Sequence, residues 1–136
     1  MNSPAQRTLE AQADNVLHMD PDKEMAEVEN LGLDWADKDA QCRFLDESKK
    51  SLHAQLATEY TQNSTEGGKK PMSAAQAEVR AYADDRYTLH LEAMRDARRE
   101  ANRAKVLYDK ACVRVDLLRS LVAARREEMR LGGIRR

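Results

Sequence analysis

The chain has 136 residues, the length of one domain, and 35% of them are charged whereas 4% are aromatic. The apolar content of 41% can supply helix seams but not a thick globular core. No apolar run approaches the roughly 20 residues that span a bilayer, and the polar start is not typical of a signal peptide. We therefore expect a cytoplasmic protein with no membrane partner.

Charge is divided unevenly along the chain. From Arg86 onward there are 14 Lys/Arg and 7 Asp/Glu, a net charge of +7, while the whole chain carries −1, so residues 1–85 carry −8. A basic second half predicts an anionic partner, and an acidic first half predicts a masking or docking role. Solvated faces of charged helices would give the same asymmetry without any such partner.

The first elements in chain order are an arm and a short helix. Residues 1–19 are polar and predict a flexible or loosely helical arm. Asp20 suits a helix N-cap and Pro21 the first helical position, so a short acidic helix should cover 20–31. Gly32 can end that helix.

A first helical arm follows over 34–61, because its apolar residues recur at multiples of three, four and seven. The stretch 62–72 is rich in Gly, Ser and Thr and predicts a loop between two arms. Residues 20–136 as a whole are expected to form one helical domain.

The second arm is expected over 73–131. Ser73 and Gln76 have the spacing of a capping box, which would start this arm. Asp84 or Asp85 could cap the helix again or bend it.

A long apolar stripe runs along the second arm, which lacks Gly and Pro from residue 86 to about residue 131. Gly132 and Gly133 should end the helix and leave a basic tail over 132–136. The stripe steps by three or four residues and comprises Tyr87, Leu91, Met94, Ala97, Ala101, Ala104, Tyr108, Ala111, Val115, Leu118 and Val122.

This pattern predicts an all-α protein, an antiparallel helical hairpin with one very long C-terminal helix that oligomerises through helix packing. A three-helix monomer that uses residues 20–31 as its third helix is the alternative. The residues expected to mediate homo-oligomerisation are Tyr87, Leu91, Met94, Tyr108, Val115, Leu118 and Val122.

Features of an enzyme are missing from the sequence. His18, His53 and His90 are far apart, and no glycine-rich phosphate loop is present. Cys42 and Cys112 lack the spacing of zinc ligands. We expect no catalytic residues, no metal and no cofactor.

Binding residues are better represented, because cations cluster on both arms and in the loop. Arginines three or four residues apart share a helix face and can neutralise successive phosphates of single-stranded DNA. Tyr60, Tyr82, Tyr87 and Tyr108 are candidates for base stacking. Pairing with Glu92, Asp96 and Glu100 is the competing role for the arginines. The candidate DNA-binding residues are Lys49, Lys50, His53, Lys69, Lys70, Arg95, Arg98, Arg99, Arg103 and Lys105.

Two segments, one over residues 49–56 and the other over residues 81–87 followed by 90–95, resemble small helical proteins of tailed phages encoded near single-strand annealing recombination genes. Over roughly residues 33–131 the layout is also similar to UvsY-type recombination mediators. This resemblance implies a ring-forming protein that binds single-stranded DNA, assists a recombinase or annealing protein and acts in a phage-infected bacterium. It assigns Lys49 and Lys50 to the DNA-contacting element, but His53 and Gln55 stand where that pattern has Lys and Arg.

Two other functions remain open at this point. The acidic residues Glu24, Glu27, Glu29, Asp34, Asp37 and Asp39 could form the contact face of an inhibitor or adaptor of a host nuclease or defence complex. A structural coiled-coil component of a phage particle is the third possibility.

Overall fold

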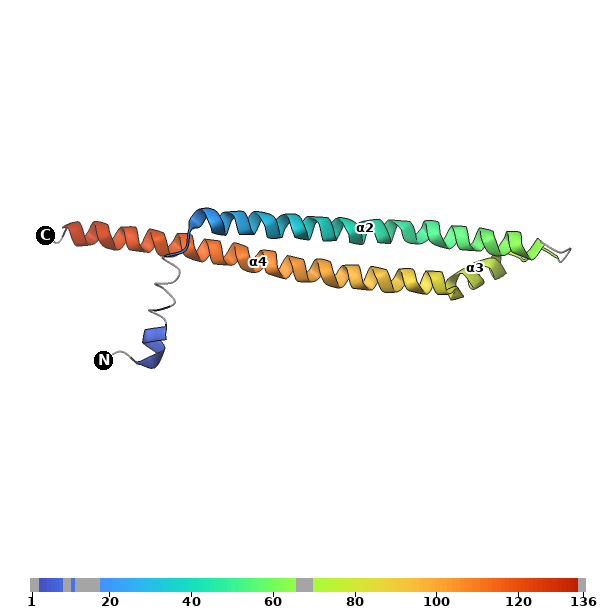
Figure 1. Cartoon of the computed structure of the whole chain (residues 1–136), viewed down its shortest axis with the longest axis horizontal. Coiled ribbons are helices and arrows are strands. Elements are labelled where there is room, and N and C mark those ends of the chain that lie inside the picture. Colours follow the sequence, from blue (N-terminus) through green and yellow to red (C-terminus); the bar gives the residue numbers. More distant parts are fainter. Residues whose placement is uncertain (1–2, 9–10, 12–17, 66–69, 135–136) are drawn as a thin grey trace. The chain divides into compact units, whose positions relative to one another are not determined.

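A computed structural model of the protein describes residues 3–8, 11, 18–65 and 70–134. Its helices are α2 (Pro21–Thr65), α3 (Ala74–Ala83) and α4 (Asp85–Ile134), and residues 4–8 are helical as well (Figure 1). None of the described residues belongs to a strand, which confirms the predicted all-α class for this part of the chain. Within the same residues, no helix combines the length and apolar composition of a transmembrane span.

Helix α2 begins where its cap predicts but is longer than expected. Asp22 N donates to Asp20 Oδ1 at 3.0 Å, and the helix then continues without a break through Gly32. The prediction of a short helix over 20–31 and a separate arm over 34–61 is therefore wrong. A Cβ placed on Gly32 would lie 3.0 Å from Tyr108 Cε2, so the missing side chain makes room for a ring and does not end the helix.

The second arm consists of two helices rather than one. Ser73 and Gln76 form the predicted capping box at the start of α3. Asp84 has an extended backbone (φ −68°, ψ 137°), and its Oδ1 accepts a hydrogen bond from Arg86 N at 2.8 Å. Asp84 thus ends α3 and caps α4, as an aspartate at a helix N-cap does.

The far end of α4 also differs from the prediction. The helix runs through Gly132 and Gly133 to Ile134, so these glycines do not end it. Neither has the left-handed backbone that terminates helices, and a Cβ on either would meet open space.

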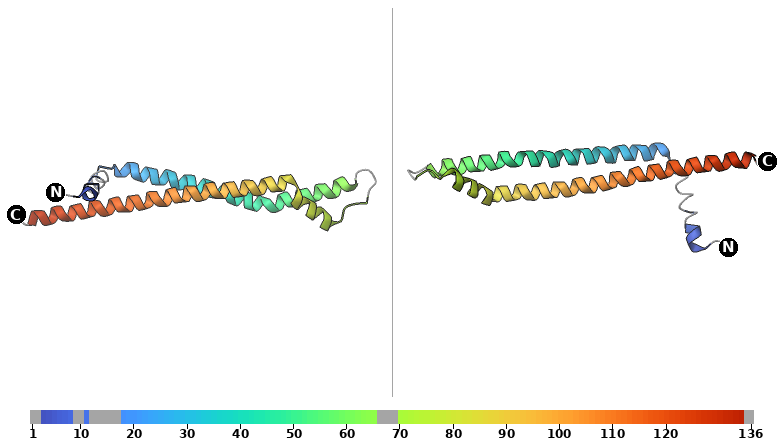
Figure 2. Two further views of the ribbon diagram at one scale, coloured as in Figure 1. Left: turned by 90° about the horizontal axis from the view of Figure 1, so that it is seen from below. Right: turned by 180° about the vertical axis from the view of Figure 1, so that it is seen from behind.

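The chain divides into two compact units, of which unit 2 comprises Trp35–Arg103. Here α2 and α4 run in opposite directions side by side, as Figure 2 shows. The buried core contains Leu56, Ala81 and Tyr87, so all three helices contribute to it. His90 Nε2 lies 2.8 Å from Leu45 O, which can only accept, so the ring nitrogen donates and ties α4 to α2.

Unit 1 comprises Met1–Asp34 and Ala104–Arg136. The described start of α2 lies antiparallel to α4 in this unit as well, because Gly32 meets Tyr108 while Glu24 pairs with Arg114 at 3.4 Å. Val115 is buried in this seam.

Candidate nucleic-acid interface

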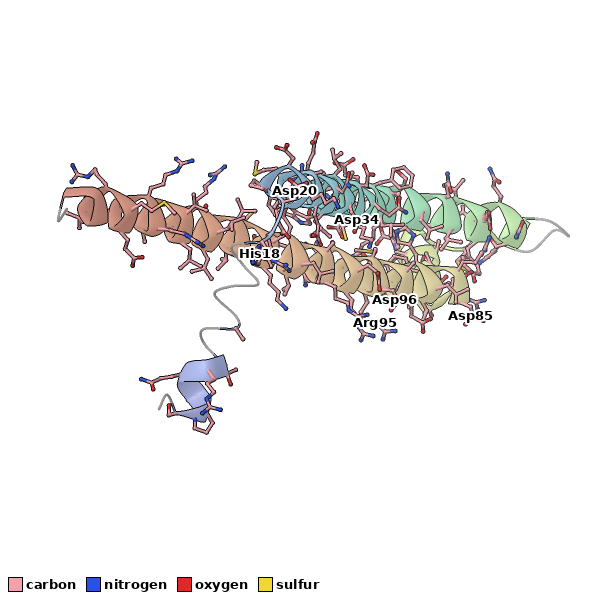
Figure 3. The ribbon with its side chains drawn as sticks, turned by 60° about the vertical axis from the view of Figure 1, so that its left-hand side comes forward. His18, Asp20, Asp34, Asp85, Arg95 and Asp96 are labelled. Carbon is pink, nitrogen blue, oxygen red and sulfur yellow. The ribbon has the colours of Figure 1, made fainter. Side chains whose placement is uncertain are left out.

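The strongest cationic feature of unit 2 is a row of arginines on α4. Arg95, Arg99 and Arg103 follow one another at intervals of four residues and therefore lie on one face of the helix. The side chains of Arg95 and Arg103 are 67% and 75% exposed. Figure 3 shows Arg95 projecting from the side of α4 that faces away from α2. We call Arg95, Arg99 and Arg103 the basic face.

Acidic neighbours compete only weakly for the basic face. Arg95 Nε lies 3.6 Å from Asp96 Oδ1, and Arg103 Nη1 lies 4.0 Å from Glu100 Oε1. Both pairs are exposed and on the same helix, a setting in which ion pairs contribute at most about 1 kcal/mol. Arg99 has no ion pair with any residue that the structure describes. These guanidinium groups remain available to a phosphate.

Arg98 has a different role from its neighbours. Its Nη2 lies 3.1 Å from Asp46 Oδ2 on α2, so this arginine links the two helices. Lys38 and Glu100 form a second link, with Nζ and Oε2 3.9 Å apart. Of the four adjacent arginines predicted to bind DNA, Arg98 is the one that the fold itself uses.

The two lysines predicted from α2 do not share one face. Lys49 is half-buried, whereas Lys50 is exposed. Neither forms an ion pair with a described residue. The long stem of a half-buried lysine can cover apolar surface while its ammonium reaches water, which suits the position of Lys49.

His53 is half-buried and packs against two tyrosine rings. Its ring centroid is 4.1 Å from that of Tyr82 and 5.9 Å from that of Tyr87. Its Nε2 lies 3.4 Å from Glu78 O, so the ring bridges α2 to α3. The prediction of His53 as a DNA contact overlooked these partners, because α3 and α4 approach α2 only in the folded chain.

The tyrosines differ in their ability to stack on a base. Tyr87 is buried, and Tyr60 and Tyr108 are half-buried. Tyr82 is 58% exposed and has an edge-on contact with Tyr87 at 5.4 Å. Only this ring among the four offers substantial surface to a nucleobase.

A polar network secures the junction between α3 and α4, and the sequence alone did not predict it. Tyr60 OH donates to Asp84 Oδ2 at 2.7 Å, and Arg86 donates to both carboxylate oxygens of Asp84 at 3.1 Å. Arg86 also pairs with Glu59 at 2.8 Å. The hydrogen bonds from Arg86 and Tyr60 hold the pKa of Asp84 well below its usual value, and the bond to Asp84 raises the pKa of Tyr60.

Three further candidate DNA-binding residues lie elsewhere. Lys70 is exposed just before α3, and Lys69 lies outside the described residues. Lys105 is exposed on the part of α4 that belongs to unit 1. The structure therefore brings together the three arginines of the basic face within unit 2.

Most residues predicted to mediate oligomerisation pack within the chain. Tyr87, Val115 and Leu118 are buried, and Met94, Tyr108 and Val122 are half-buried. Leu91 is 39% exposed. The apolar stripe is real, but α2 already covers much of it, so these residues leave little surface for another copy.

Metal ligands do not gather in the part of the chain that the structure describes: no group of three or more His, Cys, Asp or Glu is close enough to hold an ion.

Comparison of the chain with protein-family models, curated proteins and solved structures found no match.

Proposed function

We propose that this protein is a non-enzymatic phage recombination mediator that binds single-stranded DNA through the basic face of α4. The proposal retains the expected helical hairpin, the homo-oligomer and the cytoplasm of an infected bacterium as its setting. The observation that carries it is the row of Arg95, Arg99 and Arg103, whose exposed guanidinium groups have weak acidic partners or none among the described residues.

The spacing of the basic face suits a chain of phosphates. Four residues of helix rise about 6 Å, so the three guanidinium groups follow one another along the helix axis. Each offers a planar set of N–H donors that fits a phosphate, and each phosphate contact releases bound counterions. Such contacts do not depend on base sequence, which is the property a mediator needs on arbitrary single strands.

The second part of the proposal is a protein partner, a recombinase or annealing protein. Glu27 and Glu29 on the acidic start of α2 are exposed and have no ion pair with a described residue. These carboxylates could meet a basic surface of that partner. Glu24 is less available, because it is half-buried and pairs with Arg114.

Salt-dependent binding tests the DNA interface. Binding of a fluorescent single-stranded oligonucleotide would be measured by anisotropy across a salt series for the wild type and for Arg95→Gln/Arg99→Gln/Arg103→Gln. Three lost phosphate contacts should reduce the slope of log K against log salt by about 2. The matched control is Arg125→Gln/Arg126→Gln/Arg130→Gln, which removes the same charge from exposed positions on α4.

The outcomes separate the competing functions. A reduced slope for the first variant alone supports the basic face, whereas equal losses in both variants would refute this face as the interface. A wild type that ignores the oligonucleotide even at low salt would refute DNA binding. Recovery of one stoichiometric host protein from nuclease-treated lysate would then favour the adaptor.

The mediator role needs its own assay. Loading of a recombinase onto single strands covered by single-strand-binding protein should accelerate when the wild type is added, and the basic-face variant should lose that acceleration. Unchanged loading in the presence of the wild type would contradict this role even if the DNA is bound.

A further inference from the structure

Tyr82 on α3 is an exposed tyrosine whose ring is held by two other rings of unit 2. Its centroid lies 4.1 Å from that of His53 on α2, and the two planes are inclined by 34°. Tyr87 on α4 meets the same ring at 83°, with the centroids 5.4 Å apart. Packing of aromatic rings in these geometries favours one orientation of each ring. We call the Tyr82 ring with these two neighbours the aromatic platform.

The ring of Tyr82 retains open surface despite these contacts. Tyr82 is 58% exposed, whereas Tyr87 is 6% exposed. Bases of single-stranded DNA bind proteins by stacking on aromatic side chains, and this contact tolerates any base because every base has a π-face. The open part of the Tyr82 ring is a surface of this kind.

Hydrogen bonds anchor the aromatic platform to the fold. Nε2 of His53 lies 3.4 Å from the carbonyl oxygen of Glu78, one turn before Tyr82 on α3. Just after Tyr82, the carboxylate of Asp84 accepts a hydrogen bond from Tyr60 OH on α2 at 2.7 Å. The ring is therefore positioned before a ligand arrives, and a preorganised side chain loses less entropy on binding than a free one.

A second exposed aromatic residue of unit 2 lacks this support. Phe44 on α2 is 63% exposed and has no ring neighbour among the residues that the structure describes. It precedes His53 by nine residues, about two and a half helical turns, so the two lie on opposite sides of α2. What distinguishes Tyr82 is its ring neighbours, since both residues are exposed.

Two cations lie one helical turn from His53. Lys49 and Lys50 precede it by four and three residues on α2, and neither forms an ion pair with a described residue. Lysine ammonium groups contact phosphates without reading the bases. These two lysines are placed to hold the phosphate next to a base stacked on Tyr82.

Acidic residues also lie near the ring. Arg86 pairs with both Glu59 and Asp84, at 2.8 and 3.1 Å, which compensates these two carboxylates. Glu78 is exposed one turn before Tyr82 and brings a negative charge to α3. The charges around the ring are thus mixed, so we expect stacking rather than charge to supply the contact at Tyr82 itself.

We propose that Tyr82 is a stacking platform for one unpaired nucleobase of single-stranded DNA, with Lys49 and Lys50 on the adjacent phosphate. The inference rests on the DNA binding of the proposed function and adds a basis for recognising unpaired bases. It does not depend on the basic face of α4. Both faces of a base inside a duplex are covered by neighbouring bases, so only a single strand can place a base on this ring.

A strand without bases tests the stacking. Anisotropy would compare a fluorescent oligothymidylate with an abasic deoxyribose-phosphate strand of the same length and charge. The wild type should bind the oligothymidylate at least about fivefold more tightly. Equal binding of the two strands would overturn the proposal, and this comparison needs no variant that could misfold.

Substitution of the ring assigns the stacking to Tyr82. Tyr82→Ala should weaken binding of the oligothymidylate at least about fivefold and leave binding of the abasic strand unchanged, whereas Tyr82→Phe keeps the ring and should bind as the wild type does. The matched control is Phe44→Ala, which should keep the preference for bases. Circular dichroism would check that the variants remain helical. A Tyr82→Ala variant that keeps the wild-type preference, or an equal loss in Phe44→Ala, would overturn the assignment.

The salt dependence tests the two lysines. Stacking releases no counterions, so Tyr82→Ala should keep the wild-type slope of log K against log salt. Lys49→Gln/Lys50→Gln should reduce that slope by about 1.4, since each phosphate contact on a single strand contributes about 0.7. An unchanged slope in this variant would overturn the assignment of the phosphate to these lysines.

The same measurements separate this inference from the basic face. A wild type that prefers bases, combined with a basic-face variant that keeps the wild-type slope, would remove the basic face and leave the aromatic platform in place. A basic-face variant that loses slope, combined with equal binding of the abasic strand by the wild type, would do the reverse.

Discussion

Replacing Leu56 with alanine tests whether α2, α3 and α4 share a packed core in unit 2. Leu56 is 1% exposed and belongs to the core cluster with Ala81 and Tyr87, with Leu52 and Ala57 packed against it. The substitution removes three buried carbon atoms, worth roughly 2.4 kcal/mol at about 0.8 kcal/mol each. Residual cavity adds to this cost, so we expect a loss of about 3 kcal/mol in the free energy of unfolding.

Urea unfolding followed by far-UV circular dichroism would measure the change. Leu89→Ala is the matched control on α4 of the same unit, because Leu89 is 63% exposed and should change stability by no more than about 0.5 kcal/mol. Equal stabilities for the two variants would refute the reasoning, since Leu56 could not then lie in a seam that water does not reach.

Two further predictions concern the glycine contact and the junction between α3 and α4. Gly32→Ala should destabilise the protein by about 1 kcal/mol, because displacing the Tyr108 ring outweighs the gain in helix propensity. The control is Gly132→Ala, which should not destabilise the protein because the added methyl group meets open space. Thermal melts that rank the two variants the other way would contradict the packing of Tyr108 beside Gly32. Because the pKa of Asp84 is lowered by Arg86, its carboxylate stabilises the fold above the ordinary pKa of about 3.9, and this stabilisation is lost as the pH falls below that value. The melting temperature of the wild type should therefore fall more steeply than that of Asp84→Asn between about pH 5 and pH 3, and parallel curves would exclude this network as a source of acid sensitivity.

Local patterns in the sequence were sufficient for the helices themselves. The steps of three and four residues predicted helical arms, and Ser73 with Gln76 predicted the start of α3 because a capping box involves only neighbours in the chain. Gly32 shows where such rules fail. A glycine after an apolar stretch normally ends a helix, but here a ring from residue 108, far along the chain, occupies the space beside it.

The same distinction applies to the candidate site. The interval of four residues in the sequence was sufficient to predict that Arg95 and Arg99 share one face of a helix. The partner of Arg98 is Asp46, 52 residues away, so no helical spacing could separate this structural arginine from its neighbours. His53 likewise gained its contacts with Tyr82 only when α3 folded against α2.

Small residues are prominent in the seam of unit 2, where Ala77, Ala81 and Ala101 are among the most buried side chains. Each contributes little apolar surface, so no single layer holds the helices together and stability accumulates along their length. Amide hydrogen exchange should consequently be graded, with protection declining towards the helix ends instead of disappearing in one global step. Such a helix can release a terminal turn to a partner while its middle stays folded.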